Sequence, residues 1–488
     1  MTLPGLNIIS RVRQPADGIA VKTGTAFFVG TTERGAVGAE TLVQSMTDYE
    51  LLCGARAGFT TMYDSAETFF REGGSRLYVG RVVGPAAIAA SVDIYDALGS
   101  TSTDKNLLAT AKSPGAWGNS LLVSIIAGDV AGEFKVQTTH STDATVNEVS
   151  PSLLTPAAAV AWSASSAYLT LTLGVSAAEN PRVQGPLSLI SGDDDAASIV
   201  DATWLAALNG LPKLLGPGQV AAPGRTTSGG HTQVLAHAAA KNRVALLDYA
   251  DTGTAATLQT AALTDRADIN ARDGATFAPW GVIPGIAGGT TRKVPWSAVQ
   301  AGILARNDKA GLSVNEPSAG DNGRPQYAID LSQPAWTDAD RELLNNAGVN
   351  VVKRTRNGGI AVYGYRTLAN PVTNSLLVPF SNARLYMAIA EDASIILDTF
   401  EFKQIDGRGF VLGEVQGELL GMLLGYYRQG ALYGATPNDA YTVDVGAQVN
   451  TPATLAADEL HAVINLRMSP FAEVVTLEIA KTSVTEVV

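Results

Sequence analysis

Side chains suited to acid–base chemistry are few in this chain. Four histidines occur among 488 residues: His140, His231, His237 and His461. Only His231 and His237 lie near a further candidate, Asp248, in a segment that alternates predicted strands and helices. No Gly-x-Ser-x-Gly motif, phosphate-cradling glycine loop or carboxylate–histidine spacing surrounds them. We therefore interpret all three as surface or capping polar residues, and we predict no catalytic residue and no bound cofactor.

Three consecutive acids, Asp193, Asp194 and Asp195, could bind a divalent cation. They directly precede a predicted helix over residues 196–208. Carboxylates at a helix N-terminus accept hydrogen bonds from the free N–H groups and interact favourably with the dipole, so helix capping is favoured over metal binding. The single cysteine, Cys53, excludes an internal disulfide and is predicted to be a small buried hydrophobe. With so few thiols and imidazoles, we predict no metal site.

The overall charge argues against nucleic acid as a direct ligand. The net charge is −12, and no cluster of Lys and Arg stands out in the sequence, whereas phosphate neutralisation needs one. Only 16% of the residues are charged and 49 are glycine, which suits a protein with much surface buried in an assembly, although many monomeric enzymes are similar. No segment approaches membrane-spanning length and the N-terminus lacks signal-peptide features, so we expect cytosolic folding and no membrane insertion.

The predicted strands and helices along the sequence indicate a mixed α/β chain. A strand over residues 20–30, a helix over 62–72 and a strand over 76–83 form a β-α-β opening. Residues 129–186 contain short alternating runs that are typical of an all-β insertion facing solvent. A second strand–helix alternation follows over residues 219–281 and predicts another α/β layer.

The C-terminal segment predicts a helix over residues 411–429 that ends at Gly430. Its apolar side chains recur at helical spacing: Val415, Leu419, Met422, Leu423 and Tyr426. Three glycines, Gly417, Gly421 and Gly425, lie on one face, and each costs about 1 kcal/mol relative to alanine. We therefore predict that another backbone packs very closely against this face. Strands are predicted over residues 440–445, 460–468 and 473–479, the second with one apolar face.

A β-strand is predicted at each end of the chain, and neither strand has an evident partner within the chain. Residues 6–14 are β-prone but separated from the first core strand by Pro15 to Gly18, and residues 483–488 have no chain left to pair with. An orphan strand at a terminus invites a partner subunit. The candidate inter-subunit arm residues are Leu6, Ile8, Ile9, Val12, Val484, Thr485 and Val487.

Several segments in a fixed order resemble the tail sheath proteins of contractile bacteriophage tails and related contractile injection systems. Their order over most of the chain is specific to that family. They lie at residues 25–30, 45–50, 69–82, 117–119, 294–308, 315–317, 338–350, 356–368, 430–434, 440–443 and 469–475. Residues 370–375 and 380–385 depart from the pattern, because many members carry a tryptophan and paired arginines there, and residues 190–195 only approximate the family's glycine-rich loop. These departures leave open whether the chain is closer to phage virions or to injection devices.

The resemblance implies a non-enzymatic subunit that forms stacked hexameric rings around an inner tube and contracts to drive that tube through a cell envelope. It implies self-association, contacts with the tail tube, baseplate and tail terminator proteins, and a place in a virion tail or injection particle assembled in the bacterial cytoplasm. The alternatives are a cytosolic α/β enzyme that forms a small oligomer, or another virion structural protein such as a tube or capsid subunit.

The predicted fold is an α/β (α+β) multidomain chain whose core domain is discontinuous and combines both chain ends. The predicted parts are an N-terminal β-arm (1–19), a first core part (20–105), a β-rich outer insertion (106–186), a middle α/β domain (187–335), a second core part (336–480) and a C-terminal β-arm (481–488).

Overall fold

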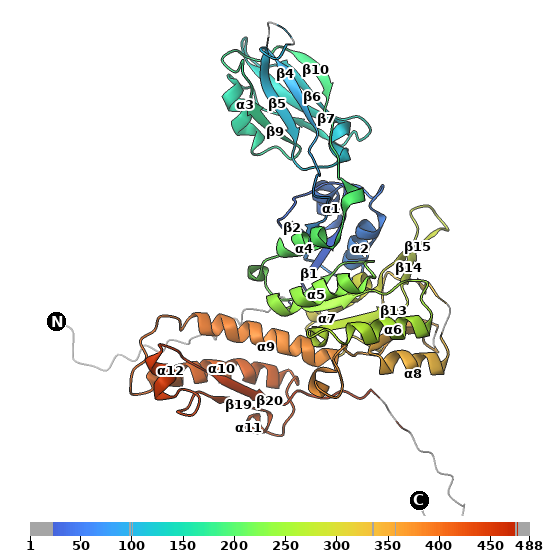
Figure 1. Cartoon of the computed structure of the whole chain (residues 1–488), viewed down its shortest axis with the longest axis vertical. Helices are drawn as coiled ribbons and strands as arrows, with labels where there is room; N and C mark the ends of the chain where they lie inside the picture. The colour runs from blue at the N-terminus through green and yellow to red at the C-terminus, as the bar shows by residue number, and fades with distance from the viewer. Residues whose placement is uncertain are drawn as a thin grey trace, which may run out of the picture.

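The computed structural model describes residues 23–96, 99, 101–333, 336–356, 358–473 and 476. Figure 1 shows three units: a β-rich outer unit at the top, a middle α/β unit, and a C-terminal unit at the lower left. The predicted α/β class with several sheets is confirmed.

The middle unit is built on an eight-stranded sheet with the order β18-β17-β13-β12-β11-β1-β3-β2. Its inner strands pair in parallel, and β2 and β18 close the two edges in antiparallel pairs. The inner strands are apolar on both faces because helices cover both sides. The strands are β1 (Ala26–Gly30), β2 (Thr41–Val43), β3 (Leu77–Arg81), β11 (Gln219–Ala221), β12 (Val244–Leu247), β13 (Gly274–Ala278), β17 (Val349–Arg354) and β18 (Ile360–Tyr363).

The two faces of this sheet carry separate cores. The adjacent residues Phe27 and Phe28 point to opposite faces and belong to different clusters of buried side chains, as the two-residue period of a strand requires. Helices α2 and α7 contribute to the Phe28 core, and α5, α6 and α8 to the Phe27 core. The helices are α1 (Met46–Cys53), α2 (Thr60–Arg71), α4 (Asp201–Asn209), α5 (Ser228–Lys241), α6 (Ala255–Asp265), α7 (Trp296–Lys309) and α8 (Asp338–Asn346).

Short elements complete the middle unit. A three-stranded sheet with the order β15-β14-β16 projects beside α2 (Figure 1). Its strands are β14 (Gly281–Pro284), β15 (Thr291–Val294) and β16 (Asp330–Leu331).

The described residues of all units include short 3-10 helices. They are η1 (Ala116–Ser120), η2 (Ala196–Ser198), η3 (Lys213–Leu215), η4 (Ala271–Asp273) and η5 (Ser375–Leu377).

The sheet corrects the predicted division into domains. Strand β1, assigned to the first core part, pairs with β11 of the predicted middle domain, and β13 of that domain pairs with β17 of the second core part. The predicted core strands and the predicted middle domain therefore share one sheet. The residue pattern within each segment could not predict this shared sheet, because parallel strands pair across long stretches of intervening sequence.

The outer unit packs two antiparallel sheets, β4-β5-β9 and β10-β6-β7-β8, around a core of its own. It begins before the predicted residue 106, since β4 belongs to it and Ile88 bridges to Asp193. Its elements are β4 (Ser91–Tyr95), β5 (Lys105–Ala111), β6 (Leu121–Ala127), β7 (Phe134–His140), β8 (Asn147–Val149), α3 (Pro156–Ser163), β9 (Leu169–Leu173) and β10 (Gln184–Ser188).

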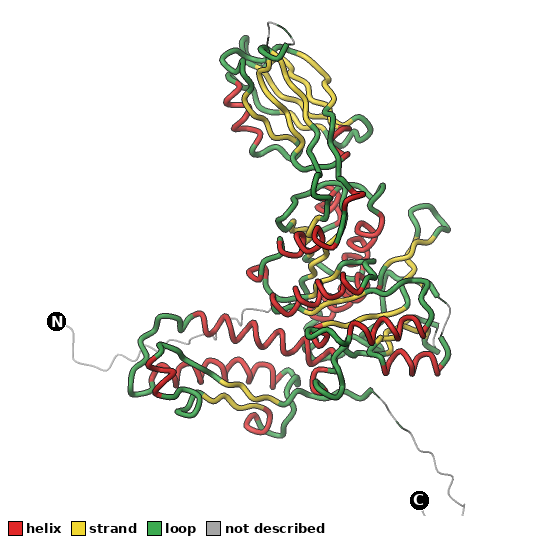
Figure 2. Tube along the Cα trace, viewed as in Figure 1, coloured by secondary structure: helices red, strands yellow, loops and turns green. Residues whose placement is uncertain are grey.

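The C-terminal unit packs two long helices beside a two-stranded sheet, β19-β20 (Figure 2). The predicted apolar stripe of α10 is confirmed, since Val415, Leu419, Leu423 and Tyr426 are buried. Glycines with left-handed backbone stand just before and after α10, Gly409 at φ 80° and Gly430 at φ 79°. The elements are α9 (Phe380–Asp398), α10 (Phe410–Arg428), α11 (Pro437–Ala440), β19 (Tyr441–Asp444), α12 (Pro452–Ala456) and β20 (Val463–Leu466).

Candidate assembly surfaces

Helix α9 joins the C-terminal unit to the middle unit. Its first turns, including Phe380 and Met387, pack in the Phe28 core of the middle unit, whereas Leu385 and Ile389 pack in the C-terminal core. The buried guanidinium of Arg384 donates to Asp308 Oδ2 of α7 at 2.7 Å. Because one helix belongs to two cores, the C-terminal unit is held in a defined orientation.

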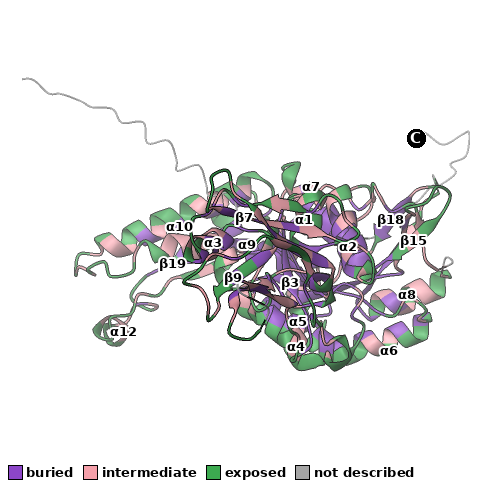
Figure 3. Cartoon of the chain, turned by 90° about the horizontal axis from the view of Figure 1, so that it is seen from above, coloured by how far each residue is buried: buried purple, intermediate pink, exposed green. Residues whose placement is uncertain are grey.

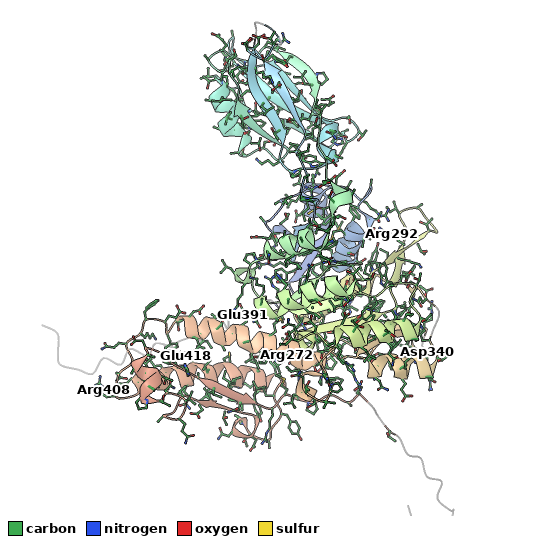
Figure 4. The ribbon with its side chains drawn as sticks, viewed as in Figure 1. Arg272, Arg292, Asp340, Glu391, Arg408 and Glu418 are labelled. Atoms are coloured by element: carbon green, nitrogen blue, oxygen red, sulfur yellow. The ribbon has the colours of Figure 1, made fainter. Side chains whose placement is uncertain are left out.

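The outer face of α10 is bare. Gly417, Gly421 and Gly425 are exposed, and no atom of the described residues lies within 4 Å of the position that a Cβ would take at any of them. The predicted close approach of another backbone is therefore not made by the described residues of this chain. The buried apolar face on the opposite side holds the helix in place. Glu414 and Glu418 are also exposed on α10, and Figure 4 labels Glu418.

The sheet β19-β20 has room for further strands. Among the described residues it has only two strands, Thr442 facing Asn465 and Val443 facing Ile464. The predicted apolar face of β20 is confirmed, because Ile464 and Leu466 pack against the C-terminal core. A two-stranded sheet is marginal by itself and leaves rows of backbone donors and acceptors at its edges. The predicted third strand, over residues 473–479, lies largely outside the described residues.

The candidate arm residues cannot be placed. Leu6, Ile8, Ile9, Val12, Val484, Thr485 and Val487 all lie outside the described residues. Their role in joining subunits stays a prediction.

The acid–base candidates were interpreted as surface or capping residues. All three are buried, so the surface alternative is wrong. The His231 ring faces acceptors at both nitrogens: Nδ1 lies 2.6 Å from Asp265 Oδ2, and Nε2 lies 3.0 Å from the Asp248 carbonyl oxygen. Burial lowers the pKa of His237 to about 3, and the neighbouring Arg243 acts in the same direction. These contacts fasten α5 to α6 and β12.

Asp248 caps α7 rather than standing in a catalytic cleft. Its carboxylate accepts hydrogen bonds from the Ser297 N–H at 3.0 Å, the Ser297 hydroxyl at 2.6 Å and the Gly224 N–H at 3.0 Å. Burial raises the pKa of Asp248, and the hydrogen bonds from Ser297 oppose that rise. The described residues around His231 and Asp248 leave no space for even a water molecule, so this cluster has no room for a substrate.

The acid run at 193–195 joins the outer unit to the middle unit and does not cap α4, whose N-cap is Val200. Asp194 pairs with the buried Arg81 of β3 at 2.7 Å. Asp195 accepts from the Ala86 N–H at 2.9 Å. Burial lowers the pKa of Arg81, and the Asp194 carboxylate acts in the opposite direction. The predicted capping of one helix over 196–208 is wrong for α4, because Asp194 binds Arg81, which is distant in sequence. Asp195 is instead the N-cap of the short helix η2, and its Oδ1 accepts from the Ser198 hydroxyl at 2.6 Å.

A basic cluster that the sequence did not reveal lies at the end of β17. Arg324, Lys353, Arg354 and Arg356 line one cavity of about 570 Å³. The signal in the sequence was Lys353, Arg354 and Arg356 crowded within four positions, but Arg324 comes from a distant loop. Within the part of the chain that the structure describes, no group of three or more His, Cys, Asp or Glu residues could hold a metal ion. No described helix is long and apolar enough to span a membrane.

No protein-family model matches the chain, and no curated protein matches it in sequence. Solved structures do match. The sheath tail protein of Listeria innocua has a TM-score of 0.64 at 14% identity, covering 92% of this chain and 93% of its own. The sheath tail protein of Desulfitobacterium hafniense has a TM-score of 0.60 at 16% identity, covering 91% and 93%. This chain has the fold of contractile tail sheath proteins.

The same sheath fold occurs in the anti-feeding prophage. Its helical sheath in the contracted state has a TM-score of 0.55 at 17% identity and covers 99% of this chain and 100% of its own. The sheath fold therefore includes the outer unit as well as the middle and C-terminal units. The resemblance seen in the sequence is confirmed at the level of the fold.

Proposed function

We propose that the chain is the structural subunit of a contractile sheath. Copies would stack as hexameric rings around an inner tube, in an extended state that shortens on triggering and drives the tube through a cell envelope. The observation that carries this proposal is the sheath fold, which covers 91–99% of this chain and at least 93% of the sheath proteins compared with it.

We propose that the terminal arms link neighbouring subunits. Residues 6–14 and 483–488 would add strands to the β19-β20 sheet of other copies, because that sheet has only two strands among the described residues. Each main-chain hydrogen bond contributes roughly 0.5–1.5 kcal/mol, and the chain between arm and core acts as a hinge. Subunits linked in this way can slide during contraction without separating.

The bare face of α10 is the proposed contact with the tube. Its glycines allow a partner backbone to approach closely, and the exposed Glu418 beside them can pair with a basic side chain. The baseplate and tail terminator would bind the two ends of the sheath. We propose no enzymatic activity, since the acid–base residues brought together by the fold are buried and serve to join helices.

Contraction needs two arrangements of the same subunits that differ modestly in free energy. A small difference at each subunit is multiplied by the number of copies in the lattice. The particle would be assembled in the bacterial cytoplasm and would carry either a genome or an effector.

Electron microscopy of the negatively stained protein tests the proposal. The full chain should form hollow tubes, and a variant without residues 483–488 should form none. A matched control replaces those residues with an equally long alternation of Val and Thr, which keeps the β propensity and should retain the tubes. Small discrete particles from every variant would support the α/β enzyme instead. Tubes from the truncated variant would retain the sheath but contradict the role of the C-terminal arm.

A further inference from the structure

None of the described residues fills the basic cavity at the end of β17. Its volume of about 570 Å³ is within the range of protein ligand pockets. The loop around Arg324, the end of β17 at Lys353 to Arg356, and Tyr363 of β18 line it.

Two of the cations in the cavity form no ion pair with a described carboxylate. Arg324 pairs with Asp321 at 2.8 Å, and Arg354 pairs with Asp330. Within the described residues neither Lys353 nor Arg356 forms an ion pair; Lys353 Nζ instead lies 3.6 Å from the centre of the Tyr363 ring. The cavity therefore offers two uncompensated positive charges next to an aromatic ring.

The electrostatics of Lys353 agree with this geometry. Burial lowers its pKa, and the nearby guanidinium groups of Arg341 and Arg356 lower it further. Such repulsion between like charges is relieved when an anionic partner binds. The cavity is thus suited to an acidic segment.

The loop between α9 and α10 presents the complementary groups. Phe402 at its tip is fully exposed and has a left-handed backbone with φ 62°. Asp398 and Glu401 are exposed beside it, and neither forms an ion pair among the described residues. We call these three residues the acidic tip.

The remaining charges of this loop are already satisfied within it. Lys403 pairs with Glu414 at 3.5 Å, and its Nζ lies 3.9 Å from the centre of the Phe400 ring. Asp406 pairs with Arg408 at 3.2 Å. The acidic tip therefore carries the uncompensated charge of the loop, and this charge is negative.

The acidic tip and the basic cavity lie at opposite sides of the molecule. Figure 4 labels Arg408, close to the tip, at the far left and Asp340 of α8 at the right. Figure 3 shows β18, which lines the cavity, on the side of α8 and far from α10. One chain cannot bring the two together, but a head-to-tail contact between copies can, and such heterologous contacts generate rings.

We propose that the acidic tip of one copy enters the basic cavity of its neighbour. Phe402 packs on Tyr363, and Asp398 and Glu401 pair with Lys353 and Arg356. This contact rests on the proposed function in one respect, that copies of the chain lie side by side in a closed ring. It concerns side chains of the folded units and is independent of the terminal arms.

Cysteine cross-linking tests the contact directly. The only native cysteine, Cys53, is buried, so any cross-link must form through the introduced cysteines. The variant carrying both Phe402→Cys and Tyr363→Cys should give a ladder of covalent dimers, trimers and larger species after mild oxidation or with a short bismaleimide. Each single variant should stay monomeric on a denaturing gel without reductant. Tubes from the double variant without any ladder would overturn the contact and leave the sheath standing. A ladder without tubes would support the contact and contradict the sheath. The absence of both tubes and ladder would contradict both proposals.

Charge exchange provides an independent test. The cavity variant Lys353→Glu/Arg356→Glu and the tip variant Asp398→Lys/Glu401→Lys should each form at least tenfold fewer tubes than the unmodified chain. The combined fourfold variant should recover most of them, which loss of folding could not produce. Lys213→Glu and Glu179→Lys change exposed charges elsewhere and should leave the tube yield unchanged. Wild-type yield from the cavity variant, or no recovery in the combined variant, would overturn the proposal.

Discussion

Replacing Arg81 by methionine should loosen the outer unit without unfolding it. The Arg81 side chain is 1% exposed at the junction between the outer and middle units. Its guanidinium donates to the carbonyl oxygens of Thr32 at 3.2 Å, Glu33 at 3.0 Å, Gly35 at 3.2 Å and Pro114 at 2.8 Å, and to Asp194 Oδ1 at 2.7 Å. Two of these acceptors, Pro114 and Asp194, belong to the far side of the junction.

The magnitude follows from breaking a buried charge pair, which costs about 3–5 kcal/mol. The Asp194 side chain is 17% exposed and can recruit water, so we expect a cost near the lower end, about 3 kcal/mol. Because each 1.4 kcal/mol is a factor of ten, the equilibrium for opening the junction should rise by about two orders of magnitude. The outer unit should remain folded because it has its own core.

Hydrogen exchange measured by mass spectrometry can separate these effects. Amides that bond across the junction, such as Gly84 to the Asp194 carbonyl oxygen at 2.9 Å, should exchange about 100-fold faster in the variant. Amides of the β6–β7 pair should exchange as in the unmodified protein. Arg182→Met, an exposed arginine of the outer unit, is the matched control. Unchanged exchange at Gly84, or faster exchange throughout β6 and β7, would refute this account of Arg81.

Four further outcomes are expected. Burial raises the pKa of Asp392 to about 6, so the folded state binds this proton more tightly than the unfolded chain. Stability should therefore fall as pH rises from about 4 to 6, by about 1–2 kcal/mol after allowing for solvent screening, and Asp392→Asn should abolish this dependence in urea titrations. Gly421→Ala should stabilise the isolated subunit by about 1 kcal/mol, because nothing lies within 4 Å of the added Cβ, yet weaken tube binding in a co-sedimentation assay. His231→Gln should lower the free energy of unfolding by about 1–3 kcal/mol, since it removes the buried contact with Asp265 while Ser228 and Tyr249 still donate to that carboxylate. Replacing residues 86–194 by a short linker should leave tubes visible in micrographs, because the chain enters and leaves the outer unit where Gly84 meets Asp194.

Much of the secondary structure was predictable because side-chain periodicity is a local property. The stripe of Val415, Leu419 and Leu423 predicted α10 and its buried face, and the alternation around Ile464 predicted β20. A helix or a strand needs only its own residues to show which face is apolar. The order of short motifs also predicted the sheath fold.

The tertiary structure alone decided which segments cover those faces. Strand β1 pairs with β11 almost two hundred positions away (Ala26 with Gln219), and this merges two predicted domains into one sheet. The sequence predicted His231 and Asp248 to be surface or capping residues, but it did not indicate that contacts with Asp265 and Ser297 bury them. Periodicity marks an apolar face or a charge but carries no information about the distant segment that meets it. The glycine face of α10 shows the same limit, since the sequence indicated close packing there, whereas no described atom of the chain lies within 4 Å of an added Cβ.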